Sequence, residues 1–312
     1  MVLSTIASTS AGCGGGAVNT GQLGCKFGFG YAIHAIGLKK GTIIPAETDL
    51  TLAYINGLIQ DGTAIPLVNG FSSEPTISDD TMETSVLGVE ALTLKGLHKY
   101  SFTFKEGEYF YKEMAKLVGY GNLDFILGDV NGNWLFAKNS SGDYKGFSAG
   151  QVNTKDVPAT ASETRKKTII FQLTNRIETD YNYDIVLASL AFPISEANGV
   201  NGVNLSFADA NGAVPPAAAA TTLKVKAVFA ADNHTGIEGF VLADMVYKVG
   251  SGTVTPSAIS DDGDGYYTLT VAALSSAEVL SLQLYDSAQN KNVVIASDIL
   301  YRSNNLSATV IA

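Results

Sequence analysis

The sequence has few of the residues from which most catalytic and metal sites are built. Its 312 residues include two cysteines and three histidines, and the histidines, His34, His98 and His234, are widely separated. It contains no Gly-x-Ser-x-Gly, no His-Glu-x-x-His and no phosphate-binding loop. Without these, neither a nucleophilic triad nor a zinc site is expected. We therefore predict a protein that is not an enzyme, with no catalytic residues, no metal and no cofactor.

Long hydrophobic runs are also missing. No stretch of about 18 consecutive apolar residues occurs, so no membrane span is predicted. Ser10-Ala11-Gly12-Cys13 is similar to a bacterial lipoprotein cleavage box. However, Ser10 stands where leucine is expected, and no Lys or Arg precedes it. We expect no lipid anchor and no membrane partner.

The two cysteines flank a glycine-rich loop near the start of the chain. Cys13 and Cys25 are twelve positions apart, which makes a disulfide sterically easy. In a reducing compartment they would instead be two free thiols in a flexible arm. The sequence leaves both alternatives open.

Basic residues are fewer than acidic ones. Lys and Arg number 20 against 30 Asp and Glu, which gives a net charge of −10. Residues 223–312 hold five basic and nine acidic side chains, leaving 15 and 21 for the rest, so both parts are acidic. Phosphate contacts need Lys and Arg, so tight groove binding to nucleic acid is disfavoured. An acidic surface can let DNA slide past, or serve solubility alone.

The residues that are abundant favour β-structure. Apolar residues make up 46% of the chain, there are 32 glycines and only eight prolines, and this mixture suits many strands joined by tight turns. Residues 208–222 are small and include two consecutive prolines, which predicts a linker. The linker would separate an N-terminal arm (1–25) and a β-rich assembly body (26–207) from a tail (223–312).

One strand and one helix of the body stand out. Tyr100, Phe102 and Phe104 alternate with polar residues, which predicts a strand with one buried and one solvated face. Apolar residues recur at helical spacing over 107–118, and we expect this helix to pack on the face that carries Phe102 and Phe104.

A second, shorter helix is predicted over 49–60, capped by Thr48 or Asp49. Residues 70–84 are polar and acidic and are expected to form a long exposed loop. Residues 139–167 are expected to form a long polar excursion. The body should therefore be an α+β barrel or sandwich with one or two flanking helices, and the tail a small β-sandwich. The further strands expected are 26–45, 85–105, a hairpin over 123–137, 168–174, 184–190, 223–230, 240–249, 266–271, 279–285 and 293–300.

Two acidic segments imitate calcium loops. Asp129-x-Asn131-x-Asn133 begins like one, but Trp134 replaces the glycine at position six and Ser140 the glutamate at position twelve. The Asn-Gly pair inside this segment predicts a hairpin turn.

The segment 260–265, Ser-Asp-Asp-Gly-Asp-Gly, brings three carboxylates close together. They could bind calcium weakly. A turn of the Asp-Gly kind before a strand explains the segment equally well.

The order of elements from about Leu87 to Thr174 resembles the major tail tube proteins of long-tailed bacteriophages. The order is paired strands, one helix, a hairpin around Asn131-Gly132, and an excursion that ends in the strand 168–173. Residues 262–271, Asp-Gly-Asp-Gly-Tyr-Tyr-Thr-Leu-Thr-Val, are similar to a strand of the immunoglobulin-like domains found in such proteins. The resemblance implies an immunoglobulin-like β-sandwich for the tail.

The same resemblance implies a structural virion protein whose copies form stacked rings around a DNA passage. Its partners would be copies of itself, other virion proteins, and DNA only in transient, non-specific passage. It would be assembled in the cytoplasm of a bacterial host. The 70–84 and 139–167 segments and the N-terminal arm would mediate stacking, because they are long and polar.

Two other functions stay open at the sequence level. One is a major capsid or decoration protein with jelly-roll architecture, although the two parts differ in length and a jelly-roll pair needs comparable halves. The other is a bacterial surface adhesin or lipoprotein with an immunoglobulin-like domain, which would need a convincing export signal.

Overall fold

The computed structural model describes residues 5–8, 29–46, 48–84, 86–88, 90–94, 96–174, 185–189, 192, 194–197 and 199–312. The fold is mainly β, with 49% strand and 9% helix, and two α-helices occur in the described residues. The predicted fold class is therefore confirmed. The chain divides into two compact units, Met1–Ala197 and Asn198–Ala312.

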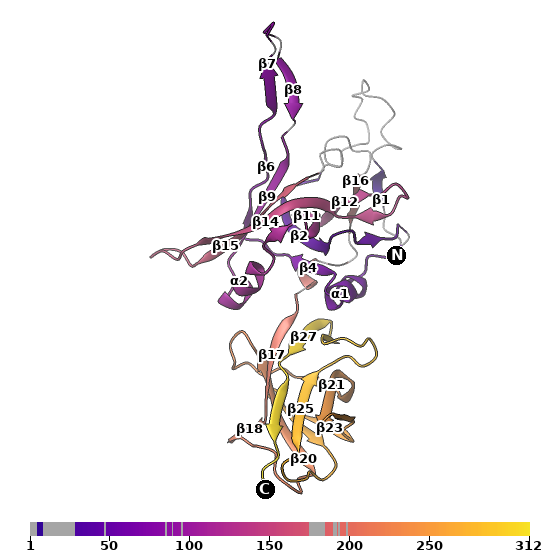
Figure 1. The fold of residues 1–312 in the computed structure, drawn as a ribbon, viewed down its shortest axis with the longest axis vertical. Coiled ribbons are helices and arrows are strands. Elements are labelled where there is room, and N and C mark those ends of the chain that lie inside the picture. Colours follow the sequence, from indigo (N-terminus) through magenta and orange to yellow (C-terminus); the bar gives the residue numbers. More distant parts are fainter. Residues whose placement is uncertain are drawn as a thin grey trace. The chain divides into compact units, whose positions relative to one another are not determined.

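The first unit is built on one large antiparallel sheet (Figure 1). Fourteen strands join it, the main path runs β1-β16-β12-β11-β14-β15-β9-β5, and the sheet curls into a half-barrel. The elements of this unit are β1 (Thr5–Ser8), β2 (Ala32–Lys39), β3 (Ile43–Ile44), α1 (Leu52–Gln60), β4 (Ala64–Leu67), β5 (Ser72–Ser73), β6 (Thr76–Ile77), β7 (Thr81–Thr84), β8 (Glu90–Leu94), β9 (His98–Phe104), α2 (Glu108–Ala115), β10 (Gly119–Tyr120), β11 (Leu123–Asp129), β12 (Asn133–Lys138), β13 (Tyr144–Lys145), β14 (Phe147–Val157), β15 (Lys166–Leu173), β16 (Ile185–Ser189) and η1 (Ile194–Glu196).

An aromatic cluster lies in the core formed on one face of this sheet. Tyr100, Phe102 and Phe104 are buried from β9, as their alternation predicts, and Phe171 of β15 packs beside them. The rings of Phe125 and Phe171 stack with centroids 3.7 Å apart. The rings come from β9, β11 and β15, so their contacts join side chains of three strands into one core.

Both predicted helices exist, with shifted ends. Helix α2 begins after Gly107 and buries Met114 in the aromatic cluster, so the predicted packing on the face of Phe102 and Phe104 is confirmed. Helix α1 is capped by Thr51, whose side chain accepts a hydrogen bond from the Tyr54 N–H (3.2 Å). The cap therefore lies later than Thr48 or Asp49, because only Thr51 directly precedes the helical turn.

The 70–84 segment is not a loop. It supplies β5, β6 and β7, and β7 pairs with β8 to form a two-stranded ribbon that projects from the sheet (Figure 1). Its polar composition suggested a loop, but backbone pairing does not need a buried face, and here both faces of the ribbon are exposed.

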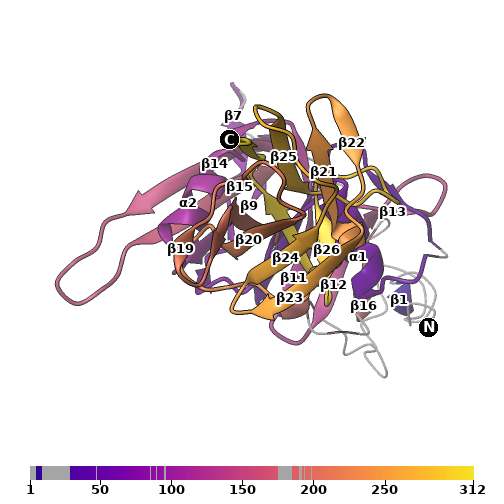
Figure 2. The ribbon, with the colours of Figure 1, turned by 90° about the horizontal axis from the view of Figure 1, so that it is seen from below.

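The 139–167 segment is not an excursion either. It holds β14, which lies between β11 and β15 inside the sheet. Strands β14 and β15 pair as far as Val157 and Lys166, and their connection projects beyond the sheet (Figure 2). Irregular structure in this segment is found at residues 139–143 and in the connection at 158–165.

The second unit is a sandwich of two sheets, with orders β23-β24-β20-β17-β27-β26 and β22-β21-β25-β28. Apart from β26 and β27, the strands follow the immunoglobulin order, in which strands D, E, B and A form one sheet and C′, C, F and G the other. Its elements are β17 (Asn201–Ser206), β18 (Ala208–Asp209), β19 (Gly212–Ala213), β20 (Thr222–Phe229), η2 (Leu242–Asp244), β21 (Met245–Val249), β22 (Gly252–Val254), β23 (Ala258–Gly263), β24 (Tyr266–Thr270), β25 (Val279–Leu284), β26 (Val294–Ala296), β27 (Ile299–Ser303) and β28 (Leu306–Thr309).

The predicted linker at 208–222 is wrong. The two units divide at Ala197 and Asn198. Strand β17, which had been assigned to the body, pairs with β20 on one side and with β27 on the other, so it is an interior strand of the second unit. Residues 208–222 are the connection from β17 to β20 and contain the small hairpin of β18 and β19.

Two predicted strands of the tail also change. The strand expected over 240–249 is shortened to β21, because η2 occupies residues 242–244. The strand expected over 293–300 is a hairpin of β26 and β27, which turns at Ser297 and Asp298 with φ of 50° and 62°. Positive φ at two adjacent residues gives the tight hairpin turn.

Candidate functional site

The Asp129 segment forms a hairpin turn, as predicted. The Asp129 carboxylate is 1% exposed and accepts hydrogen bonds from the N–H groups of Gly30 (2.9 Å), Asn131 (2.9 Å) and Asn133 (2.8 Å) and from the Asn133 side-chain amide (3.0 Å). Burial alone would raise the pKa of Asp129, but these bonds outweigh it and hold the pKa below its ordinary value. All four donors belong to the protein, so the carboxylate is satisfied without an ion.

Two of the three carboxylates of the 260–265 segment, Asp261 and Asp262, are hydrogen-bonded within the protein. Asp261 accepts bonds from the N–H groups of Gly239 (2.7 Å) and Gly263 (3.0 Å). Asp262 accepts from Thr268 Oγ1 and Ser260 Oγ, and the Thr268 bond is the main reason why the pKa of Asp262 lies below its ordinary value. In the described part of the chain, no group of three His, Cys, Asp or Glu side chains is placed to hold a metal ion.

The other residues singled out from the sequence are not brought together. His34 and His98 lie on different strands of the first unit, and His234 lies in the second. His34 Nδ1 accepts a hydrogen bond from the Asn69 N–H (3.0 Å), and burial lowers its pKa although Asp129 opposes this shift. Cys13 and Cys25, with most of the predicted arm, lie outside the described residues.

A small pocket of about 200 Å³ lies in the second unit. It is lined by Tyr247, Val249, Val254, Ala272, Ala273, Leu274 and Glu278. No histidine, cysteine or lysine lines it, so it does not bring a nucleophile and a base together.

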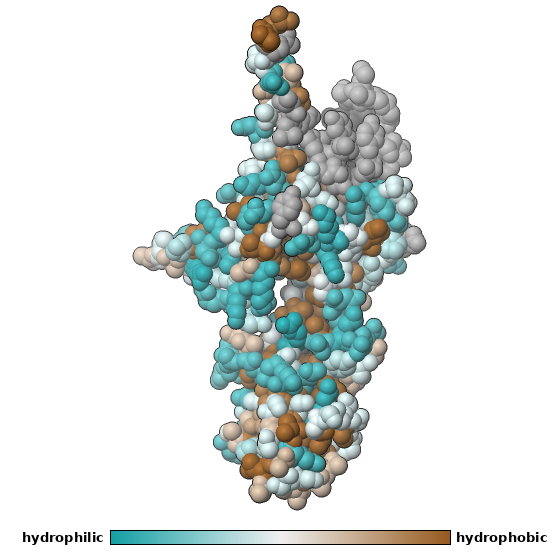
Figure 3. Space-filling model, viewed as in Figure 1, coloured by the Kyte–Doolittle hydropathy of each residue, from teal (hydrophilic) through white to brown (hydrophobic). Residues whose placement is uncertain are grey.

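A surface of a different kind lies on the β7–β8 ribbon. Met82, Val86, Leu87 and Leu92 are between 46% and 106% exposed there, and Figure 3 shows this apolar surface at the end of the ribbon. We call these four residues the ribbon tip. An isolated two-stranded ribbon is marginally stable in water, and clustered exposed apolar side chains indicate a contact surface.

The ribbon is also strongly acidic. Residues 78–94 contain Asp79, Asp80, Glu83 and Glu90 and no Lys or Arg. All four acidic side chains lie at exposed positions. A partner of the ribbon should therefore offer both apolar and basic groups.

A basic surface lies on the solvated face of β9, β14 and β15. Lys99 and Lys105 alternate with the buried aromatic residues of β9, so they point to the opposite face. Lys155 of β14 lies opposite Thr168 of β15, and Thr168 lies opposite Thr103 of β9. The two threonine hydroxyls are hydrogen-bonded to each other (2.9 Å). Since Thr103 shares its face of β9 with Lys99 and Lys105, Lys155 lies on the same face as these two lysines. Lys166 and Lys105 both lie over the ring of Phe71, at 5.2 and 3.6 Å from its centroid.

We call Lys99, Lys105, Lys155 and Lys166 the lysine face. Lys166 forms an ion pair with Glu163 (2.9 Å). Among the described residues, the other three form no ion pair. Four lysines therefore lie on one face of a chain whose net charge is −10.

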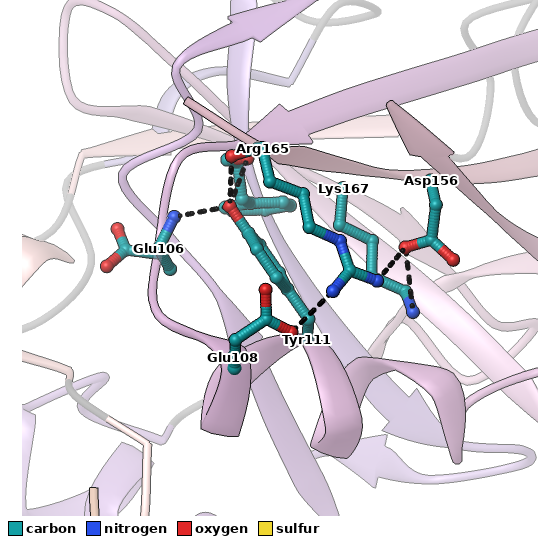
Figure 4. Close-up of polar contacts among 7 residues, drawn as sticks. Glu106, Glu108, Tyr111, Asp156, Arg165 and Lys167 are labelled. Carbon is teal, nitrogen blue, oxygen red and sulfur yellow. Dashed lines mark hydrogen bonds and ion pairs between the residues drawn. The ribbon is translucent and has the colours of Figure 1, made fainter. Parts of the chain in front are cut away.

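The opposite side of the β14–β15 ribbon is held to helix α2 by polar contacts (Figure 4). The Tyr111 hydroxyl accepts a hydrogen bond from the Glu106 N–H and donates one to the Arg165 carbonyl, both at 2.9 Å. The Arg165 guanidinium pairs with Glu108 (2.5 Å) and Asp156 (3.2 Å), and Lys167 also reaches Asp156 (3.4 Å). These contacts fix the base of the ribbon that carries Lys155 and Lys166.

Tyr111→Phe is expected to lower the free energy of unfolding of the first unit by about 2 kcal/mol. Tyr111 is 2% exposed, and the Glu106 N–H and the carbonyls of Phe104 and Arg165 would lose its hydroxyl as a partner. Glu108→Gln is the matched comparison, and it should leave the urea midpoint unchanged because its ion pair with Arg165 is solvent-exposed. Urea unfolding followed by the fluorescence of Trp134, the only tryptophan, measures both. Equal midpoints for the two variants would contradict this ranking.

Comparisons with known proteins add no family to this description. No family model matches the chain, and no similar curated protein was found. In the described residues, neither helix has the length and apolar character needed to cross a membrane.

Sequence reasoning missed both surfaces. The lysine face could be recognised only from the register of three strands, β9, β14 and β15. The sequence alone shows the alternation around Lys99 and Lys105 and nothing of how the strands pair. The ribbon tip had a clear signal, since Val86 and Leu87 interrupt an acidic segment, but that signal was assigned to strands of the body.

Proposed function

We propose that the protein is a structural subunit of a bacteriophage tail tube, in which copies of the chain form stacked rings around a DNA passage. The observation that carries the proposal is the ribbon tip, where Met82 and Leu92 on the two strands and Val86 and Leu87 in the turn between them are all exposed. A monomer gains nothing from exposing them, whereas an assembly covers them.

The large sheet supports the same proposal. It curls only half-way round, so its outer strands leave backbone groups that strands of neighbouring copies can pair with. Closing such a sheet with neighbouring copies removes the exposed edges, as barrel closure does within one chain. The proposed partners are copies of this chain and other virion proteins, with DNA in transient passage.

The proposal includes a non-enzymatic role and a place in the virion. Asp129 and Asp261, from the segments that imitate ion sites, accept hydrogen bonds from backbone N–H groups of their own turns and of distant segments, which favours a structural role for them. The immunoglobulin-like unit has its own core of buried residues, so it can be displayed without contributing to the ring.

Negative-stain electron microscopy of the purified full-length chain tests the proposal, with light scattering across a concentration series as the second readout. Stacked rings or hollow tubes are expected above a critical concentration. Closed shells would instead identify a capsid protein. Monodisperse monomers at all concentrations up to solubility would refute an assembly role.

A further inference from the structure

The two surfaces of the first unit complement each other. The ribbon, residues 78–94, carries four acidic side chains and no basic one, and its tip is apolar. The lysine face carries four basic side chains and borders Phe71, which is 53% exposed. Both charge and apolar character are therefore matched between one surface and the other.

The ribbon does not satisfy its own lysine face. It leaves the sheet at β6 and β9 and extends away from β14 and β15 (Figure 1). Among the described residues, the only ion pair of the lysine face is the one between Lys166 and Glu163. An acidic ribbon that cannot turn back onto this face can reach it only on another molecule.

We propose that the acidic ribbon of one copy docks on the lysine face of a second copy. Glu90, which lies on the same face of the ribbon as Met82 and Leu92, faces Lys99 and Lys155, and the ribbon tip packs beside Phe71. Glu83 pairs with Ala91 and lies on the other face, so the experiment below changes both glutamates. This contact is heterologous, since a surface meets a different surface, and such contacts propagate into rings or stacks. The inference rests on the proposed assembly function and specifies which surfaces carry it.

A charge-swap experiment tests the contact in the full-length chain. The face variant is Lys99→Glu with Lys155→Glu, and the ribbon variant is Glu83→Lys with Glu90→Lys. Alone, each variant places like charges opposite each other, so the critical concentration for assembly should rise by about tenfold or more. An equimolar mixture should restore assembly, because the acidic ribbon of the face variant meets the basic face of the ribbon variant, and the basic ribbon meets the acidic face.

The matched control is Lys39→Glu with Lys40→Glu, which makes the same change in net charge at exposed residues outside both surfaces. It should assemble like the unaltered chain. Circular dichroism melts check that every variant folds. The contact should also weaken between about 0.05 and 0.5 M salt, because screening shortens with ionic strength.

Each outcome that differs from this expectation contradicts a specific part of the proposal. A face variant that assembles normally would overturn the docking contact while leaving the tail-tube proposal intact. If the mixture stayed unassembled although both variants folded, the pairing of these two surfaces would be wrong. Loss of binding to a fluorescent 30-base-pair DNA duplex in the face variant, with assembly unchanged, would assign the lysine face to nucleic acid. An unaltered chain that never assembles would overturn both proposals.

Discussion

A fragment of residues 198–312 is expected to fold as a stable monomer, whereas a fragment of residues 223–312 is expected to be unfolded. The two differ by strand β17 and the connection that follows it. Strand β17 is interior to its sheet, since it pairs antiparallel with β20 and parallel with β27. Removing it separates β27 and β26 from the rest of that sheet.

The side chains lost with β17 decide the size of the effect. Val203, Leu205 and Phe207 are at most 8% exposed and lie in the core of the second unit. Burial of each such side chain contributes about 2 kcal/mol, so their loss costs about 6 kcal/mol. A small domain has only about 5–15 kcal/mol of stability in total. The shorter fragment also leaves the backbone edges of β20 and β27 unpaired, which adds to the cost.

Urea unfolding followed by circular dichroism, together with amide NMR spectra, distinguishes the fragments. Residues 198–312 should give a dispersed spectrum and one cooperative transition, and sedimentation should show a monomer. Residues 223–312 should give a collapsed spectrum without a transition. A cooperative transition of similar midpoint in both fragments would show that β17 is dispensable and that the domain begins where the linker was predicted.

The same boundary governs truncation of the first unit. A chain that ends near Pro215 keeps β17 without either of its partner strands, so it exposes the apolar residues of that strand. A chain that ends at Ala197 avoids this, and is the suitable fragment for asking whether the first unit assembles without the second.

The sequence correctly predicted the helices and strands whose formation depends on the residues of a single segment. The alternation at Tyr100, Phe102 and Phe104 and the spacing of apolar residues in α2 are properties of one segment, and both were confirmed. The Asn131-Gly132 turn was also found, since Gly132 adopts a φ of 81° that favours glycine.

The domain boundary could not be found in this way because its cause is non-local. Asn201 of β17 pairs with Tyr301 of β27, and nothing in either segment indicates a partner that distant. Small residues and prolines in 208–222 do favour an irregular path, but an irregular path also connects strands within one domain. Composition alone does not distinguish a linker from such a connection.

The functional surfaces were hidden for the same reason. Lys99 and Lys155 lie on strands separated by β15, and only the registers of β14 and β9 with β15 place them on one face. The acidic ribbon was correctly predicted to be exposed, but its strand pairing was missed because neither face of it is buried. A two-sided polar strand has no periodic signal to detect.

Asp129→Ala is expected to lower the free energy of unfolding of the first unit by about 4 kcal/mol. Three backbone N–H groups and one side-chain amide donate to this carboxylate, and it is 1% exposed. A buried donor left without a partner costs about 1–3 kcal/mol, and these four hydrogen bonds are part-buried, so each contributes toward the lower end of that range. Water entering the space of the lost carboxylate recovers part of that, which is why the expected cost is less than the sum. Trp134 is buried directly after this turn, so its fluorescence reports the transition.

Asp129→Asn is the control for charge, and pH gives the decisive comparison. The pKa of Asp129 in the folded protein lies below its ordinary value of 3.8, so the ionised form is favoured by folding. Its contribution is therefore complete above that ordinary value and is lost as the pH falls through the lower pKa of the folded state. The unaltered chain should lose stability over this acidic range, and Asp129→Asn should be less stable at neutral pH but lose less on acidification. If both proteins lost stability in parallel, the turn would be held by its backbone geometry, and the carboxylate would contribute no charge-dependent stability.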